Sequence, residues 1–103
     1  MKILAVEDDV VSRAVLRKAL RRLGHETIEA ADGEAAWELL QKNTDVRVVV
    51  SDWTMPNTDG LELCRRIRKR VGAEYTYFIL LTGRDATEEN QTTAADAGVD
   101  DFL

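Results

Sequence analysis

Short apolar runs alternate along the chain with longer stretches of helical periodicity, and this alternation restricts the fold more than any other feature. The apolar runs predict strands over residues 2–6, 46–51 and 77–82, with a fifth strand beginning at 101–103. A weak alternation of polar and apolar residues predicts a further strand over residues 26–30. The amphipathic stretches between them predict helices over residues 9–23, 32–43, 61–71 and 86–97. Because parallel strands need crossover connections, this order predicts an α/β domain with a doubly wound, parallel, five-stranded sheet whose last strand is incomplete.

Two of the predicted helices carry a clear apolar stripe. The first stripe consists of Leu16, Leu20 and Leu23, and the second consists of Leu61, Cys64, Ile67 and Val71. Residues three or four apart share one face of a helix, so we expect both stripes to pack against the sheet.

The composition predicts one soluble domain that spans residues 1–103. That length suffices for one compact domain and is too short for two. The net charge of −5 disfavours direct binding to nucleic acid. Cys64 is the only cysteine, which excludes an internal disulfide and favours a reducing compartment. No apolar run is long enough to cross a membrane, so we expect a cytoplasmic protein.

Acidic side chains follow two of the predicted strands. Glu7, Asp8 and Asp9 come after the first apolar run, and Asp52 follows the third. Sites in open parallel sheets form at the carboxyl ends of the strands, where we expect these acids to converge. Two like charges about 4 Å apart repel by about 4 kcal/mol at an effective dielectric of 20. A hard cation relieves that repulsion, and a few carboxylates with water suit Mg²⁺.

This constellation indicates phosphoryl chemistry. A carboxylate beside Mg²⁺ can act as a nucleophile and form an acyl phosphate. Thr82, after the fourth strand, would supply a hydroxyl group to a phosphoryl oxygen. Asp9 has an alternative role, since an acid in this position often caps the following helix.

Four motifs together resemble the receiver domain of bacterial two-component response regulators. They are ILAVEDD (3–9), VVVSDWTMPNTDGLEL (48–63), ILLTG (79–83) and AGVDDFL (97–103), and the resemblance covers the whole chain. It implies the flavodoxin-like strand order 2-1-3-4-5. It also implies a phosphorylation-controlled signalling switch whose donor is a histidine kinase or a phosphotransfer protein.

The resemblance assigns a role to each site residue. Asp52 would be the phosphoacceptor, while Thr82 would bind the phosphoryl group and Phe102 would be the aromatic switch residue. The Mg²⁺ ligands would be Asp8, Asp52, the backbone carbonyl of Thr54 and, through water, Glu7. Such a domain catalyses its own phosphoryl gain and loss and is not a turnover enzyme on small metabolites.

One departure from the family concerns the end of the chain. The family has a lysine shortly after a segment like DDFL, and no lysine of this sequence matches it. We therefore expect a C-terminally truncated receiver that lacks the final helix. Apolar surface exposed by that loss would favour dimers or domain swapping.

Three other features have simple structural interpretations. We expect Gly60 to provide a positive φ in the loop after Asp52. Trp53 is either an aromatic of the pocket or a surface residue. The basic run at residues 65–70 is interpreted as a solvated helix face and not as a nucleic-acid site.

Three alternative functions compete with the signalling switch. A phosphatase of the haloacid dehalogenase type needs a second aspartate two residues after the nucleophile, where this chain has Thr54. A flavin-binding module needs a glycine- and hydroxyl-rich loop after the first strand, where this chain has VEDDV (6–10). The third possibility, an interaction domain that works without phosphorylation, stays open.

Overall fold

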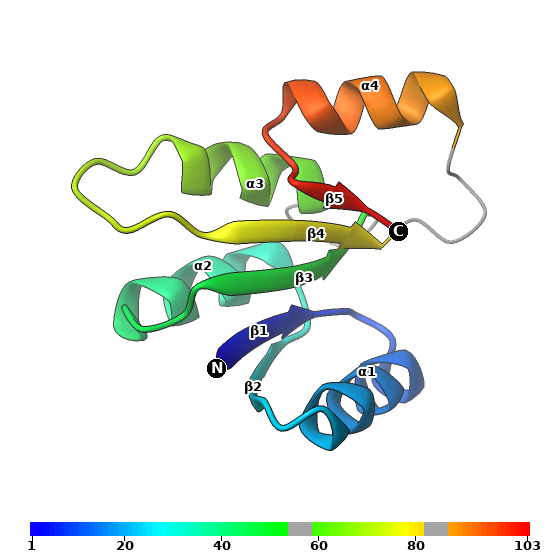
Figure 1. Cartoon of the computed structure of the whole chain (residues 1–103), viewed down its shortest axis with the longest axis vertical. Coiled ribbons are helices and arrows are strands. Elements are labelled where there is room, and N and C mark those ends of the chain that lie inside the picture. The colour runs from blue at the N-terminus through cyan, green and yellow to red at the C-terminus, as the bar shows by residue number, and fades with distance from the viewer. Residues whose placement is uncertain (54–58, 82–86) are drawn as a thin grey trace.

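A parallel sheet of five strands, in the order β2-β1-β3-β4-β5, runs through the computed structural model (Figure 1). The structure describes residues 1–53, 59–81 and 87–103. The strands are β1 (Lys2–Val6), β2 (Glu26–Ala30), β3 (Val48–Asp52), β4 (Tyr77–Leu81) and β5 (Asp101–Phe102). The helices are α1 (Val10–Arg22), α2 (Gly33–Lys42), α3 (Gly60–Arg68) and α4 (Glu88–Asp96). The predicted α/β class and the strand order 2-1-3-4-5 are therefore confirmed.

The register of the sheet sets the carboxyl ends of β1 and β3 next to each other. Val6, the last residue of β1, pairs with Ser51, and Asp52 pairs with Leu81 of β4. Residues that immediately follow these pairs lie at the same edge of the sheet. The winding direction changes here, because the chain passes from β1 outward to β2 and returns to β3 on the other side.

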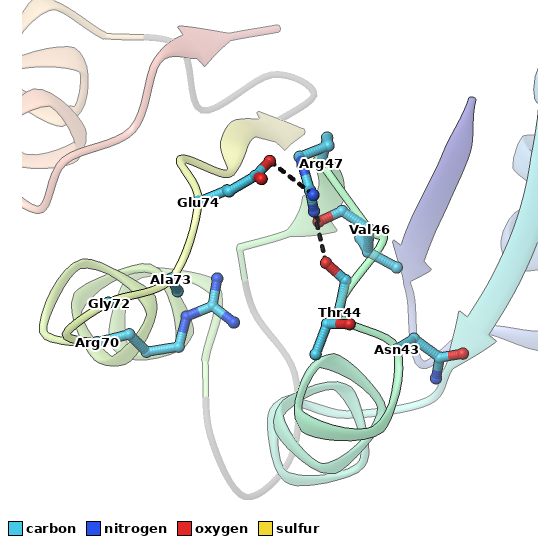
Figure 2. Close-up of a pocket in the computed structure, with 8 residues that line it drawn as sticks. All are labelled: Asn43, Thr44, Val46, Arg47, Arg70, Gly72, Ala73 and Glu74. Atoms are coloured by element: carbon cyan, nitrogen blue, oxygen red, sulfur yellow. Dashed lines mark hydrogen bonds and ion pairs between the residues drawn. The ribbon is translucent and has the colours of Figure 1, made fainter.

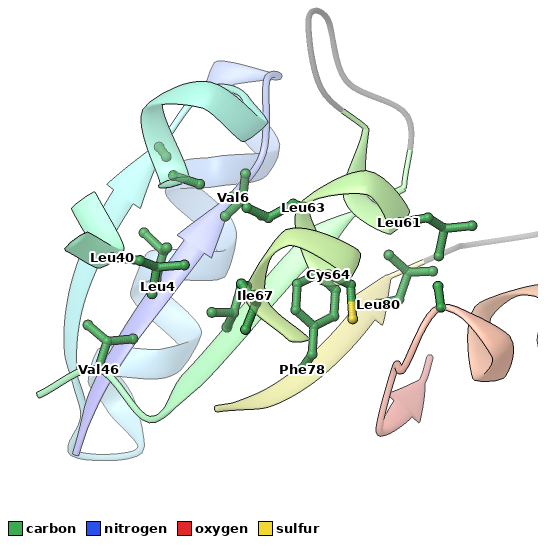
Figure 3. Close-up of a cluster of buried hydrophobic side chains, with 14 of the residues drawn as sticks. Leu4, Val6, Leu40, Val46, Leu61, Leu63, Cys64, Ile67, Phe78 and Leu80 are labelled. Carbon is green, nitrogen blue, oxygen red and sulfur yellow. The ribbon is translucent and has the colours of Figure 1, made fainter. Parts of the chain in front are cut away.

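The main hydrophobic core lies between the sheet and helices α2 and α3 (Figure 3). Leu4, Val6, Phe78 and Leu80 project from the strands into this layer and are fully or almost fully buried. The helices contribute Leu40, Leu61, Leu63, Cys64 and Ile67. The predicted burial of Cys64 is confirmed. Removing the thiol from water also raises the pKa of Cys64 to about 11, so the group is a poor nucleophile.

Two predicted apolar stripes are shorter than the sequence suggested. Helix α1 has no fully buried residue, and Leu23, which ends it, is 73% exposed. Helix α3 ends at Arg68, so Val71 lies beyond it and is 98% exposed. The hydrophobic pattern continued past the point where backbone capping ends each helix.

An aspartate caps the N-terminus of three of the helices. Asp9 accepts a hydrogen bond from the Ser12 amide at 2.8 Å, and Asp32 and Asp59 cap α2 and α3 in the same way. The alternative role of Asp9 as a helix cap is therefore the one that the structure supports.

Among the described residues, no helix has the length and apolar composition needed to cross a membrane.

Candidate functional site

Three carboxylates converge at the carboxyl edge of the sheet. Glu7 and Asp8 follow β1, and Asp52 is the last residue of β3. One carboxylate oxygen from each lies within 4.8 Å of the other two. The sequence therefore identified the residues that the sheet brings together, whereas Asp9 caps α1.

Backbone contacts hold the segment that carries Glu7 and Asp8. The Glu7 amide donates to the Ala30 carbonyl at 3.0 Å, which prolongs the pairing of β1 with β2. The Glu7 carbonyl accepts a hydrogen bond from the Arg13 guanidinium at 2.9 Å. These bonds fix the backbone of Glu7 at the edge of the sheet, so the position of the acidic cluster follows from strand pairing.

The Glu7 carboxyl group is partly buried within the cluster. Its Oε2 atom is buried and has no hydrogen-bond partner among the described residues. Burial, together with hydrogen-bond and charge interactions with the carboxyl groups of Asp52 and Asp8, raises the pKa of Glu7 to about 7. Close to neutral pH, this carboxyl group therefore either holds a proton or needs a cation.

The three side chains fit a hard divalent cation such as Mg²⁺. All three offer carboxylate oxygens, and the buried Oε2 of Glu7 has no hydrogen-bond partner in the part of the chain that the structure describes. Asp8 is exposed, which leaves water access to the cluster. Thr54, whose carbonyl was assigned to the same cation, lies outside the described residues.

Asp52 is oriented by its own neighbours in the chain. Its Oδ1 atom accepts a hydrogen bond from the Trp53 amide at 2.9 Å, and its carbonyl accepts one from the Ser51 hydroxyl at 2.8 Å. The Trp53 amide therefore orients the carboxylate of Asp52 through one of its two oxygens. Thr82, the predicted phosphoryl-binding hydroxyl, lies outside the described residues.

Gly60 has a different role from the one predicted. It is the first residue of α3 and is not among the described glycines with a positive φ. A Cβ atom here would lie 2.4 Å from the Asp52 carbonyl oxygen and 2.9 Å from Leu80 Cδ1. The expectation of a left-handed backbone was therefore wrong. Glycine is needed because α3 begins in direct contact with the end of β3.

Trp53 and Phe102 connect the acidic edge to β5. Their rings pack edge to face, with centroids 6.0 Å apart. Trp53 also packs against the buried core, so it is not a simple surface residue. Phe102, the predicted switch residue, pairs with Leu80 in the sheet and is half-buried. The contact between Trp53 and Phe102 therefore connects the residue after Asp52 directly to β5.

Two features of the structure were missed or underrated from the sequence. Asp100 accepts hydrogen bonds from the Arg68 guanidinium, the Phe78 amide and the Tyr75 hydroxyl, and so ties α3 and β4 to the approach to β5. The basic run at residues 65–70 is not only a solvated face, because Arg66 pairs with Glu34 and contacts the Trp37 ring. Neither contact has a sequence signal, because the partners lie far apart in the chain.

Comparison with known proteins places the chain among receiver domains. A sequence model of the response regulator receiver domain matches residues 3–103. The chain is 39% identical to a chemotaxis protein CheY homolog of Campylobacter jejuni, over its whole length and 79% of that protein. It is 36% identical to the chemotaxis protein CheY1 of Helicobacter pylori, again over its whole length and 83% of that protein.

Solved structures give the same result for the fold. The structure of the Vibrio cholerae chemotaxis protein CheY4 superposes with a TM-score of 0.90 at 29% identity, covering 99% of this chain and 83% of that one. The receiver domain of the Francisella response regulator 1452 has a TM-score of 0.86 at 31% identity, covering 99% of this chain and 81% of that one.

Proposed function

Because the chain belongs to the response regulator receiver domain family, we propose that it is a phosphorylation-controlled switch in which Asp52 accepts a phosphoryl group. The observation that carries the proposal is the convergence of Glu7, Asp8 and Asp52 within 4.8 Å at the carboxyl edge of the sheet. The donor would be a phosphohistidine of a sensor kinase or a phosphotransfer protein. We place the reaction in the cytoplasm, where such donors act.

The proposed transfer is an in-line displacement. Oδ2 of Asp52 attacks the phosphorus atom and forms an acyl phosphate, while the phosphorus–nitrogen bond breaks and its electron pair leaves with the imidazole. The Trp53 amide holds Oδ1 and so orients the attacking oxygen. Attack by water on the acyl phosphate later restores the carboxylate and releases phosphate. In this scheme the protein promotes its own phosphorylation and dephosphorylation and turns over no small metabolite.

Glu7, Asp8 and Asp52 would hold the divalent cation, with the Thr54 carbonyl as a further ligand. When bound, Mg²⁺ supplies positive charge that offsets the carboxylates and the incoming phosphoryl oxygens. Asp8 contributes an exposed carboxylate, and Glu7 contributes the buried oxygen that has no other described partner. Thr82 would donate a hydroxyl hydrogen bond to the transferred group.

The experiment is intact-mass measurement after incubation with acetyl phosphate and Mg²⁺. We expect one phosphoryl adduct in the wild-type protein, its loss with a chelator, and its absence in Asp52→Asn. Asp9→Asn is the matched control, because it makes the same chemical change beside the cluster. Asparagine caps helices as well as aspartate, so this control should be labelled normally.

Two outcomes would contradict the assignment. Labelling of Asp52→Asn at the wild-type rate would place the phosphoryl group elsewhere. A folded wild-type protein that takes no phosphoryl group would instead favour an interaction domain that works without phosphorylation. A haloacid dehalogenase-type phosphatase is not favoured, because Thr54 stands where that class has its second aspartate.

A further inference from the structure

A pocket at the opposite edge of the sheet has no role in the proposed phosphoryl transfer. It has a volume of about 280 Å³ and lies between the loop after α2 and the loop after α3, next to the amino ends of β3 and β4. Its lining includes Thr44, Arg47, Arg70, Gly72 and Glu74, and we call it the basic pocket (Figure 2). Asp52 lies at the other end of β3.

Arg70 is a fixed cation on one wall of the basic pocket. Its Nη2 atom donates a hydrogen bond of 2.8 Å to Oγ1 of Thr76, a residue that is only 2% exposed. This bond anchors the guanidinium on the protein. Figure 2 shows the guanidinium group extending from the α3 side toward the space that Arg47 and Thr44 border. The entropy of ordering this long side chain is therefore already lost before any ligand binds.

The charge of Arg70 has no acidic partner in the part of the chain that the structure describes. Arg66, Arg68 and Arg47 form ion pairs with Glu34, Asp100 and Glu74, whereas no described carboxylate pairs with Arg70. Its Nε atom is buried without a described hydrogen-bond partner. Burial lowers the pKa of Arg70, and the positive charges of Arg68 and Arg47 lower it further. An unpaired, partly desolvated cation is costly for a fold to keep.

Arg47 supplies a second guanidinium from the opposite wall. It pairs with Glu74 at 2.6 Å and donates a hydrogen bond to the Thr44 carbonyl at 2.5 Å. The Glu74 side chain is 73% exposed, so it can turn toward solvent and free one edge of Arg47. The ends of α2 and α3 carry partial negative charge, which weakens anion binding here. Arg47 offsets part of this charge next to α2, where it donates a hydrogen bond to the Thr44 carbonyl.

We propose that the basic pocket binds a small phosphate-bearing anion between Arg70 and Arg47. Guanidinium groups match the geometry of phosphate oxygens and form strong, charge-assisted hydrogen bonds with them. A volume of about 280 Å³ exceeds what a phosphate group needs and leaves room for a small sugar or similar ester. The site is independent of the phosphorylation of Asp52. We expect a dissociation constant on the order of 1 mM, because the pocket is open and contains one competing carboxylate.

The test is a titration of ¹⁵N-labelled wild-type protein followed by NMR, with a chelator present so that no divalent cation recruits phosphate to the acidic edge. Inorganic phosphate and ribose 5-phosphate are compared with chloride at equal ionic strength. We expect saturable shifts of amides in 43–47 and 70–76 and of the Arg70 Nε–H resonance with both phosphates. Tighter binding of ribose 5-phosphate would indicate an ester, and equal binding would indicate free phosphate.

Variants separate a site from general attraction to positive charge. Arg70→Met should weaken phosphate binding by about tenfold or more, since a charge-assisted pair is lost. Arg21→Met removes the same charge from an exposed position on α1 and should bind as the wild type does. The proposal is overturned if the Arg70 Nε–H resonance of the wild type does not move, if chloride produces the same shifts, or if a folded Arg70→Met protein binds phosphate normally. If the Arg70→Met protein does not fold, the response of the wild-type Arg70 Nε–H resonance to phosphate still tests the proposal.

Discussion

At the residue scale, Glu7 shows most clearly how position in the fold changes side-chain chemistry. The sequence predicted a carboxylate that acts through water, alongside Asp8. The structure buries one oxygen of Glu7 beside Asp52, and the pKa of Glu7 rises from 4.5 to about 7. A proton and a divalent cation should therefore compete for this group near neutral pH, which makes Glu7 a link between pH and metal affinity.

The raised pKa of Glu7 predicts that the metal-free protein loses stability as the pH rises. The folded protein holds the proton more tightly than the unfolded chain does, so the stabilisation is complete below pH 4.5 and is lost as the pH rises through about 7. Glu7→Gln removes this dependence. In a chelator above pH 7, we expect the variant to have a free energy of unfolding about 1–2 kcal/mol higher than that of the wild type, a figure reduced for solvent screening. Urea unfolding at several pH values measures the difference.

Glu38→Gln is the control for the Glu7 prediction. Glu38 lies on an exposed face of α2, and the substitution makes the same chemical change away from the cluster. The difference between this variant and the wild type should stay nearly constant with pH. If Glu7→Gln also shows a constant difference, the carboxyl group is not perturbed as the geometry requires.

The sequence could reveal some site residues and not others for a definite reason. Glu7, Asp8 and Asp52 follow apolar runs, so strand recognition alone places them at one edge of the sheet. Arg70 lies in an irregular segment between α3 and β4, and its importance depends on Thr76 and Arg47. Contacts of that kind arise from loop geometry, which periodicity does not encode.

At the scale of elements, strands were easier to predict than helix ends. The predicted strands over 2–6 and 26–30 match β1 and β2 residue for residue. Helix α3 was expected to reach Val71, yet it ends at Arg68, and Gly72 then adopts a φ of 79°. Local capping and the following turn end the helix, while the hydrophobic pattern runs on.

The start of α3 gives a prediction about packing against β3. Gly60→Ala would place a methyl group 2.4 Å from the Asp52 carbonyl oxygen, and backbone on both elements would have to move. We expect the free energy of unfolding to fall by about 3 kcal/mol, as for overpacked core sites. Because Asp52 moves with β3, the rate of labelling by acetyl phosphate should also fall. Chemical unfolding and intact mass measure the two effects.

Gly24→Ala separates this clash from ordinary glycine strain. Gly24 follows α1 with a φ of 91°, and a Cβ atom there would meet nothing within 4 Å. This substitution should lower the free energy of unfolding by about 1 kcal/mol through backbone strain alone and leave labelling unchanged. Equal effects of the two substitutions would mean that contact between α3 and β3 is not the reason for glycine at residue 60.

At the scale of the whole molecule, the two edges of the sheet have opposite electrostatic character. The carboxyl edge gathers the carboxylates of Glu7, Asp8 and Asp52, and the amino edge of β3 and β4 gathers Arg47 and Arg70. Strand β3 runs between them over Val48–Asp52. The net charge of −5 conceals this separation, so composition alone could not locate the basic pocket.

The acidic edge predicts that Mg²⁺ stabilises the whole fold. A cation that binds only the folded protein raises the free energy of unfolding by about 1.4 kcal/mol at ten times its dissociation constant. For a domain of this size, that gain corresponds to a rise in Tm of about 5–10 °C. Asp52→Asn removes one of the repelling charges, so without metal it should melt above the wild type and gain less from Mg²⁺.

Thermal unfolding of three proteins, with and without Mg²⁺ at equal ionic strength, checks this prediction. Asp9→Asn keeps the cap of α1 and all three clustered carboxylates, so its response to Mg²⁺ should equal that of the wild type. If Mg²⁺ leaves the wild-type Tm unchanged, the clustered carboxylates do not form a cation site. If the Tm of Asp52→Asn rises with Mg²⁺ as much as that of the wild type, the cation is bound without Asp52. The proposed nucleophile would then not be one of the metal ligands.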